Sequence, residues 1–400
     1  MDLSSALHLP SPRRVVGLMS GTSLDGIDAV LVEISGRGAS VALEQEAFAH
    51  VPYPDALRSL VRANTTADGS SVEALTRLDA RLAEAYATAT DQVLAEADRS
   101  RAALDLVGTH GQTMCHRPAP AACAGMRVRS TLQLGNPSAL AARLGVPVVG
   151  NFRAADLALG GQGAPLVPYF DAVAFAAPEE HRALLNLGGI ANLTLLPAGG
   201  ALDAVQAFDT GPGNMVIDAL ATRLYDAPYD PSGRHAGAGT PHHDLLADLL
   251  TDAYFRRSPP KSTGRGDFGA AYVDRLLGAA DARGLEADDT MATATLLTAA
   301  SVYQAYAQHV RTHRPIDVLI ASGGGVHNDT LMRMLRDAFA PIPVRTTADY
   351  GISPDAKEAL CFALLAHALV NGTPTNLPAV TGASGRARLG SLSLPPANSD

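Results

Sequence analysis

The sequence predicts an α/β protein built from two similar halves. Short apolar runs that end in glycine alternate with longer stretches of helical periodicity, which is the pattern of a layered α/β fold. The length of 400 residues exceeds what one compact core usually contains. Two strand–turn–strand units, in residues 15–34 and 183–196, lie about 170 residues apart and indicate a duplicated fold.

The first half begins with the two apolar runs that flank the turn at residues 20–26. Apolar residues recur every three or four positions between residues 71 and 97, which predicts a long amphipathic helix. A second helix is expected over residues 137–144, because proline is favoured at the first helical position. Further strands are expected at residues 104–108, 131–135 and 146–150.

The second half repeats this arrangement from residue 183. Helices are expected at residues 214–224, 290–313, 328–339 and 356–371, with a strand at 317–321. We therefore expect a first domain over residues 1–180 and a second over 181–400. The last helix, at 356–371, is expected to pack back on the first domain.

The composition is that of an ordinary globular protein, with 47% hydrophobic and 18% charged residues. The net charge of −9 argues against a nucleic-acid partner, which favours a basic face. There is no apolar run of membrane-spanning length, and residues 1–14 lack the apolar centre of a signal peptide. A cytoplasmic protein without a membrane partner is therefore expected. Three cysteines without a Cys-x-x-Cys pair favour reduced thiols over a zinc site.

Four glycine-rich turns follow apolar strands, at residues 20–26, 188–189, 211–213 and 323–325. Glycine lets backbone N–H groups approach a phosphate without interference from a Cβ atom, so these turns predict phosphate binding. The Gly-Lys-Ser/Thr ending of a P-loop is absent. Residues 264–269 match Gly-x-Gly-x-x-Gly, but no strand precedes them, so a dinucleotide site is not expected.

Paired glycine hairpins on a duplicated domain resemble the actin, hexokinase and Hsp70 superfamily. The resemblance implies a duplicated actin-like ATPase fold of the RNase H type, with ATP in the cleft between two domains. Met19 stands where the superfamily usually has an acid, so Asp25 becomes the expected carboxylate nearest Mg²⁺. The expected ATP-binding residues are Ser20, Gly21, Thr22, Ser23, Leu24, Asp25, Gly26, Ile27, Asp28, Gly188, Gly189, Gly323, Gly324, Gly325 and Asn328.

A closer resemblance is to the anhydro-N-acetylmuramic acid kinases. It is carried by motifs in chain order at residues 19–28, 110–113, 152–156, 160–168, 186–192, 208–214, 260–265, 323–325, 358 and 380–383. The resemblance implies that the enzyme opens the 1,6-anhydro ring of anhydro-N-acetylmuramic acid with water and phosphorylates O6. The products are N-acetylmuramic acid 6-phosphate and ADP, in murein recycling. A homodimer is also implied.

The same resemblance implies roles for individual residues. Asp209 matches the catalytic aspartate that deprotonates water, and Glu358 is expected to assist by orienting water or coupling to domain closure. Arg153 is expected to meet the lactyl carboxylate of the sugar. Candidates for its hydroxyl and acetamido groups are Gln112, Thr113, Asn136 and Asp156.

Two motifs depart from the family pattern. Asn151 replaces the usual aspartate before Phe152-Arg153, and residues 264–269 lack the usual glutamate, which leaves the role of that loop open. Two alternative functions also remain open. One is a kinase of another amino sugar on the same fold, and the other is an actin- or Hsp70-like ATPase that works by conformational change.

Overall fold

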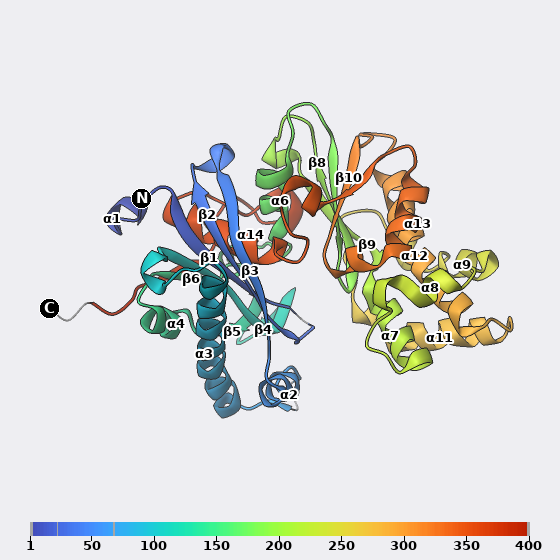
Figure 1. The fold of residues 1–400 in the computed structure, drawn as a ribbon, viewed down its shortest axis with the longest axis horizontal. Helices are drawn as coiled ribbons and strands as arrows, with labels where there is room; N and C mark the ends of the chain where they lie inside the picture. The colour runs from blue at the N-terminus through green and yellow to red at the C-terminus, as the bar shows by residue number, and fades with distance from the viewer. Residues whose placement is uncertain (1–2, 22, 67–68, 398–400) are drawn as a thin grey trace. The chain divides into compact units, whose positions relative to one another are not determined.

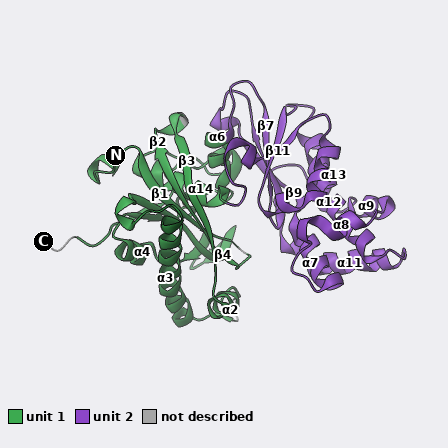
Figure 2. Cartoon of the chain, in the orientation of Figure 1, with its two compact units in different colours: residues 1–174, 356–400 green, residues 175–355 purple. Residues whose placement is uncertain are grey.

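The computed structural model describes residues 3–21, 23–66 and 69–397, which form two compact units (Figure 2). Unit 1 contains Met1–Ala174 and Ala356–Asp400, and unit 2 contains Phe175–Asp355. The chain passes from unit 1 to unit 2 after residue 174, close to the expected boundary at residue 180. It returns to unit 1 at residue 356, so that the whole segment 356–400 belongs to unit 1 and not to the second domain expected over 181–400.

The sheet of unit 1 has the strand order β12-β6-β4-β1-β2-β3, and β5 pairs with β4 outside this path. β1 is antiparallel to β2, and β2 is antiparallel to β3, whereas β4 is parallel to both β1 and β6. The strands are β1 (Arg13–Ser20), β2 (Gly26–Ser35), β3 (Ala42–Pro52), β4 (Leu106–Cys123), β5 (Met126–Leu134), β6 (Val148–Gly150) and β12 (Ser391–Ser393).

The sheet of unit 2 has the order β11-β10-β7-β8-β9. Its first three strands in the chain form an antiparallel meander, and β10 is parallel to β7 and β11. With β5 and β12 left out, the strands of unit 1 have the order β3-β2-β1-β4-β6, and those of unit 2 have the order β9-β8-β7-β10-β11. Both units therefore share the strand order 3-2-1-4-5 with the same directions. This repeated topology confirms the predicted duplicated α/β fold. The strands are β7 (Arg182–Leu187), β8 (Ile190–Leu196), β9 (Gln206–Pro212), β10 (Val318–Ser322) and β11 (Val344–Thr346).

Two long helices cover opposite faces of the unit 1 sheet (Figure 1). α3 (Val72–Glu96) begins at Ser71, whose hydroxyl accepts the N–H of Ala74 at 3.1 Å, and packs over β2 and β3. α14 (Lys357–Val370) packs over β1 and β4. Alternate residues of β1 point to opposite faces, so Val16 and Leu18 belong to the α3 core while Gly17 faces α14.

α14 approaches the sheet closely because two neighbouring strands carry glycine opposite it. A Cβ atom on Gly17 would lie 2.0 Å from the carbonyl oxygen of Ala359, and one on Gly108 would lie 2.1 Å from that of Phe362. Gly17 and Gly108 are register partners in β1 and β4. This close packing explains why the chain after residue 355 returns to unit 1.

The remaining helices of each unit pack against these sheets or against one another. Those of unit 1 are α1 (Leu3–Ala6), α2 (Asp55–Ala63), α4 (Pro137–Leu144), α5 (Ala154–Ala158), α6 (Val167–Phe175), whose last residue lies beyond the division, and α15 (Pro378–Thr381). Those of unit 2 are α7 (Asn214–Tyr225), α8 (Arg234–Ala238), α9 (His243–Leu249), α10 (Arg265–Phe268), α11 (Ala270–Asp281), α12 (Ala287–His309) and α13 (Asp329–Phe339). Among the described residues, no helix has the length and apolar character needed to cross a membrane.

Some elements differ from the sequence prediction. β3 was not expected, because its burial alternates weakly and its sequence is rich in polar residues. β4 and β5 extend well beyond the predicted 104–108 and 131–135, since they continue as a largely exposed hairpin that lacks an apolar pattern. The predicted turn at 211–213 is mostly the end of β9, and Gly213 caps α7.

Candidate active site

The first glycine turn connects β1 to β2 in unit 1. Ser20 is buried, and its hydroxyl is hydrogen-bonded to the hydroxyl of Tyr86 on α3. Leu24 has a φ of 60°, and the Ser23 hydroxyl donates to Asp25 Oδ1 at 2.8 Å. Thr22, which the sequence assigns to ATP binding, lies outside the described residues. The turn thus has a buried start and an exposed carboxylate at Asp25.

Tyr53 holds both ends of this turn. Its backbone N–H donates to the carbonyl oxygen of Asp25 at 2.9 Å. Its hydroxyl donates to Gln112 Oε1 at 3.2 Å, and Gln112 Nε2 donates to the carbonyl oxygen of Gly21 at 3.1 Å. Gln112 is completely buried, so both of its amide atoms serve the turn. Gln112 therefore links the turn to Tyr53 in this structure.

Arg153 is held by two other groups of unit 1. Its Nε and Nη2 atoms lie 3.0 and 2.8 Å from His110 Nε2, and Nη1 donates to the carbonyl oxygen of Gly163 at 2.7 Å. Because His110 Nε2 accepts these bonds, the proton of the neutral ring is on Nδ1. Burial lowers the pKa of Arg153 to about 10 and lowers that of His110 further below its usual value. Because the guanidinium is a buried charge beside a neutral imidazole, an anion near Arg153 would be favourable.

The other residues expected at the sugar have internal partners. Asp156 is fully buried and accepts hydrogen bonds from Gly163 N–H, Asn376 Nδ2 and the Thr381 hydroxyl at 2.7 to 2.9 Å. No ion pair joins it to Arg153 among the described residues. Asn136 caps α4, accepting from Ser138 and Ala139 N–H groups, and donates to Asp79. Thr113 accepts from Gln133 Nε2 at 3.2 Å.

Glu358 lies in the first turn of α14, among charged groups of unit 1. Burial raises the pKa of its carboxyl, while Lys357 and Arg153 lower it and Asp28 raises it. Lys357 itself is paired with Asp171 on α6 at 3.1 Å, and both side chains are 2% exposed. The fold therefore brings Glu358 near both Asp28 of the first turn and Arg153, although these residues are far apart in the sequence.

The second and third glycine turns pack against each other in unit 2. A Cβ atom on Gly323 would lie 2.8 Å from Asn186 Oδ1, and one on Gly325 would lie 2.6 Å from Leu187 Cβ. The carbonyl oxygens of Gly188 and Gly189 accept N–H groups from the start of α7 at 2.8 to 3.1 Å. The start of α7 thus holds the backbone of the second turn. The contact of the third turn with residues 186–187 leaves no room for a Cβ atom on Gly323 or Gly325.

Asp209 lies at the same level of the sheet as these turns. The strand registers pair Ser322 with Asn186, Asn186 with Asn192, and Asn192 with Asp209. Neighbouring strands are about 4.8 Å apart, so Asp209 on β9 is about 10 Å from the strand that leads into the second turn. A single sheet edge therefore presents both turns and this carboxylate.

The loop at residues 257–264 encloses Asp209. Thr263 N–H donates to Asp209 Oδ2 at 2.9 Å, Asp209 N–H donates to the Lys261 carbonyl at 3.1 Å, and the Tyr254 hydroxyl donates to the Asp209 carbonyl at 2.8 Å. Burial raises the pKa of Asp209 to about 6, against the opposing effects of the Thr263 hydrogen bond and the Lys261 charge. Oδ1 makes no hydrogen bond with the described residues. One carboxylate oxygen of Asp209 therefore remains available to a group from outside the described residues.

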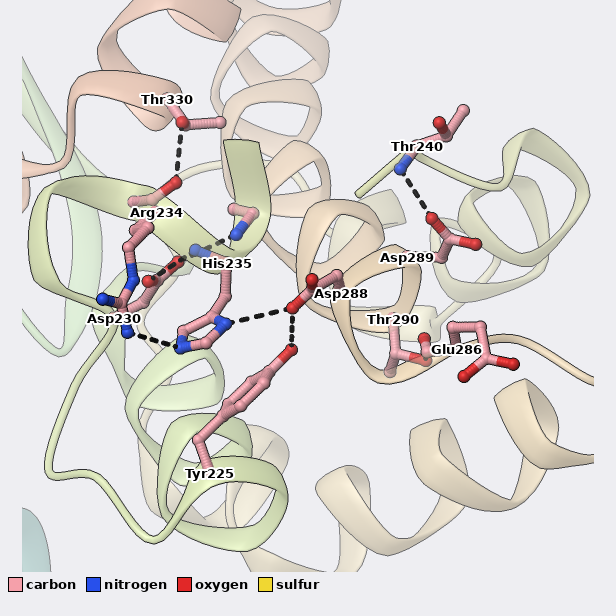
Figure 3. Close-up of polar contacts among 12 residues, drawn as sticks. Tyr225, Asp230, Arg234, His235, Thr240, Glu286, Asp288, Asp289, Thr290 and Thr330 are labelled. Atoms are coloured by element: carbon pink, nitrogen blue, oxygen red, sulfur yellow. Dashed lines mark hydrogen bonds and ion pairs between the residues drawn. The ribbon is translucent and has the colours of Figure 1, made fainter. Parts of the chain in front are cut away.

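A polar network holds the segment beside Asn328 (Figure 3). Tyr225 OH donates to Asp288 Oδ1 at 2.6 Å, His235 Nδ1 lies 3.0 Å from the same oxygen, and the two rings stack at 3.6 Å. The adjoining Gly233 approaches Asn328 so closely that a Cβ atom would lie 2.0 Å from its Oδ1. Asn328 Oδ1 also caps α13 through Leu331 N–H at 2.9 Å. The network thus sets the surroundings of the residue expected near adenosine.

Sequence reasoning missed several residues of these sites. Tyr53 and Tyr86 carry no motif, because their roles depend on elements distant in the chain. Lys261 appears in the sequence only as part of a family motif, although its carbonyl oxygen accepts the N–H of Asp209 and its ammonium lies over the ring of Tyr254. Asp218 on α7 was also missed: burial raises its pKa to about 7, and its carboxylate makes no hydrogen bond with described residues. An acid on a helix with buried apolar neighbours is the only signal that the sequence offered for it.

The repeated sheet plan, the glycine turns at strand ends and the available carboxylate together define a class of protein. It is an ATP-using phosphotransferase with the actin-like ATPase fold, in which catalysis depends on positioning and electrostatics around the phosphates.

Comparison with known proteins specifies the family. The family model for anhydro-N-acetylmuramic acid kinase matches residues 13–395, and the chain belongs to this family. An anhydro-N-acetylmuramic acid kinase of Salinibacter ruber is 73% identical over 99% of this chain and 100% of its own length. Relatives of the same name from Caldanaerobacter subterraneus and Bacillus cereus are 41% and 39% identical, over 98% and 96% of this chain and 100% and 99% of their own lengths. The predicted family is confirmed.

Proposed function

We propose that this enzyme converts 1,6-anhydro-N-acetylmuramic acid, ATP and water into N-acetylmuramic acid 6-phosphate and ADP, a reaction of murein recycling. Family membership supports the substrate, since relatives at up to 73% identity carry the name of this kinase. The single observation that carries the chemistry is Asp209, a carboxylate with a pKa of about 6 and one unbonded oxygen, level with two glycine turns.

Asp209 accepts a proton from the water that attacks C1 of the sugar. The C1–O6 bond breaks, the electron pair stays on O6, and O6 forms a bond to the γ-phosphorus as the bond to ADP breaks. The proton taken by Asp209 passes to solvent after product release. A base with a pKa near 6 is ionised at neutral pH and still accepts a proton readily, which suits this step.

The glycine turns hold ATP. The first turn, at residues 20–28, and the second, at 188–189, bind phosphate oxygens through backbone N–H groups, and residues 323–325 with Asn328 lie against adenosine. In the first turn the side chains of Ser20 and Ile27 are buried, so their contribution is structural or through the backbone. Asp25 would hold Mg²⁺, because its carboxylate is exposed and part of the turn. Mg²⁺ held there would supply positive charge to the phosphates of ATP.

Arg153 binds the lactyl carboxylate of the sugar. Its guanidinium is largely desolvated, and the hydrogen bonds described for it go to neutral acceptors, His110 Nε2 and the Gly163 carbonyl. Glu358 is the nearby acid, and an anionic ligand would add a charge-assisted hydrogen bond. For Gln112, Asn136 and Asp156 we replace the expected contacts with the sugar by roles in holding the turn, α4 and the 160–163 loop. Thr113 is the remaining candidate for a sugar hydroxyl. Glu358 assists by orienting water, and Lys357 with Asp171 fixes its helix.

Product analysis in oxygen-18 water tests the proposed function. The anhydro sugar should yield a 6-phosphate with one labelled oxygen at C1, together with one ADP per sugar. Phosphorylation of only free N-acetylglucosamine or N-acetylmuramic acid would replace this substrate by another amino sugar. ADP release that is independent of any sugar would instead indicate an ATPase that works by conformational change.

The family resemblance also supports a homodimer in the cytoplasm as part of the proposal. Light scattering coupled to size-exclusion chromatography should give a mass near twice the 41.3 kDa of one chain. Cell fractionation should recover the activity with cytoplasmic marker enzymes. A monomeric mass or recovery in the membrane fraction would contradict the respective prediction.

A further inference from the structure

Lys261 occupies an unusual position beside Asp209. It lies in the loop that encloses this carboxylate. The carbonyl oxygen of Lys261 accepts the N–H of Asp209, and two residues further on, Thr263 N–H donates to Asp209 Oδ2. Its side chain is 9% exposed. The Nζ atom lies over the ring of Tyr254, 4.7 Å from the centroid, and the Tyr254 hydroxyl donates to the Asp209 carbonyl. The ammonium is therefore held next to the proposed base.

This ammonium forms no close ion pair with the described residues, and Asp209 is the acid whose charge acts on it. No carboxylate oxygen lies within 4.0 Å of Nζ there, although burial disfavours its charge and lowers the pKa of Lys261. Arg257 lies over the same ring at 5.3 Å and repels it, but Arg257 has a partner in Asp267 at 3.9 Å. A cation–π contact recovers only about 0.5–2 kcal/mol. Lys261 is thus a largely buried cation prepared for an anion from outside the chain.

We propose that Lys261 is a further catalytic residue, whose ammonium binds an oxyanion of the reactants beside Asp209. This inference rests on the proposed function. Two reactant groups have the required chemistry, the phosphoryl group in transfer and the carboxylate of the sugar acid. In either case the positive charge lies close to where water loses its proton and O6 becomes negative, so it stabilises the reacting system electrostatically.

The charge of Lys261 also acts on Asp209 itself. It keeps the carboxylate more readily ionised and opposes the effect of burial. Among the described residues, the other titratable groups near this pair include Tyr254, Arg257 in the same loop, Asp267 on α10 and His309 on α12. Removal of Lys261 alone should therefore raise the pH at which the acidic limb of kcat/KM falls. A residue that merely supports the fold would leave this limb unchanged.

The test compares Lys261→Met with the matched control Arg257→Met, and with Lys261→Arg to restore the charge. With the anhydro sugar and ATP, Lys261→Met should lower kcat/KM at least about 100-fold, as removal of one electrostatic donor does. Lys261→Arg should recover part of this loss. Arg257→Met should change kcat/KM less than about threefold. Thermal unfolding of Lys261→Met should not begin below that of the wild type, because no ion pair is lost.

A second sugar distinguishes the two sources of the oxyanion. 1,6-Anhydro-N-acetylglucosamine lacks the lactyl carboxylate. A loss that persists with this sugar assigns Lys261 to the phosphoryl group, and a loss that disappears assigns it to the sugar carboxylate. If the turnover of Lys261→Met is within twofold of the wild-type value and its acidic limb is unshifted, the inference is overturned while the proposed function stands. Failure of the wild type to phosphorylate the anhydro sugar would overturn the proposed function and this inference together.

Discussion

Replacement of Asp209 by Asn removes the proposed base with little change in shape. The Asn side-chain oxygen retains the hydrogen bond from Thr263 N–H, and the backbone bonds to Lys261 and Tyr254 are unaffected. Neither the second nor the third glycine turn contacts this side chain through a described hydrogen bond. The substitution therefore separates proton transfer from nucleotide binding.

The expected magnitudes follow from the environment of Asp209. Loss of a general base lowers kcat by about 10²–10⁴-fold, while the Kd for ATP stays within about twofold. Burial raises the pKa of Asp209 from 3.8 to about 6, so the folded state is less stable once this group ionises, with the full effect above pH 6. Two pKa units correspond to about 3 kcal/mol. Asp209→Asn should accordingly unfold at a higher temperature than the wild type at pH 7, and at a similar temperature at pH 4.

Three measurements test this reasoning. A coupled assay of ADP release gives kcat, calorimetric titration gives the Kd for ATP, and thermal unfolding at pH 4 and pH 7 gives the stability difference. In the wild type, kcat/KM should fall below pH 6 as Asp209 is protonated. Near-normal turnover by Asp209→Asn would remove this residue from the base role. A lower unfolding temperature at pH 7 would show that its charge stabilises the fold, contrary to the burial argument.

Three further substitutions test how the site is supported. Tyr53→Phe removes the hydrogen bond to Gln112 Oε1, so it should raise the KM for ATP several-fold and lower the free energy of unfolding by about 1–2 kcal/mol. The control Tyr272→Phe removes a buried hydroxyl without a described partner and should be neutral, and equal effects of the two substitutions would refute the role of Tyr53 in the first turn. Gly108→Ala should lower the free energy of unfolding by more than about 2 kcal/mol in denaturant titrations, because its Cβ would overlap the Phe362 carbonyl. The control Gly278→Ala on α11 has open space and should be tolerated, and an unchanged stability of Gly108→Ala would contradict the packing of α14. Tyr225→Phe should raise the KM for ATP but not for the sugar, and a reversed preference would detach its network from adenosine.

The sequence predicted the parts of the fold that have local signals. The long helix expected at 71–97 is α3, whose apolar residues recur at helical spacing. Three of the four predicted glycine turns follow strands as expected, because glycine at a strand end is a short-range signal, whereas the fourth, at 211–213, lies mostly within β9. β3 and the exposed ends of β4 and β5 were missed, since strands without a buried face lack an apolar alternation.

By itself, the sequence determined the duplicated α/β fold, the family and the places of most glycine turns, because each depends on residues that are close together along the chain. Tertiary structure alone decided which side chains are available. It buried Gln112 and Asp156 among internal partners, although both lie in motifs. It also brought Lys261 to Asp209 across about 50 residues of chain. Hydrogen-bond satisfaction and burial depend on partners from distant elements, and no local pattern encodes them.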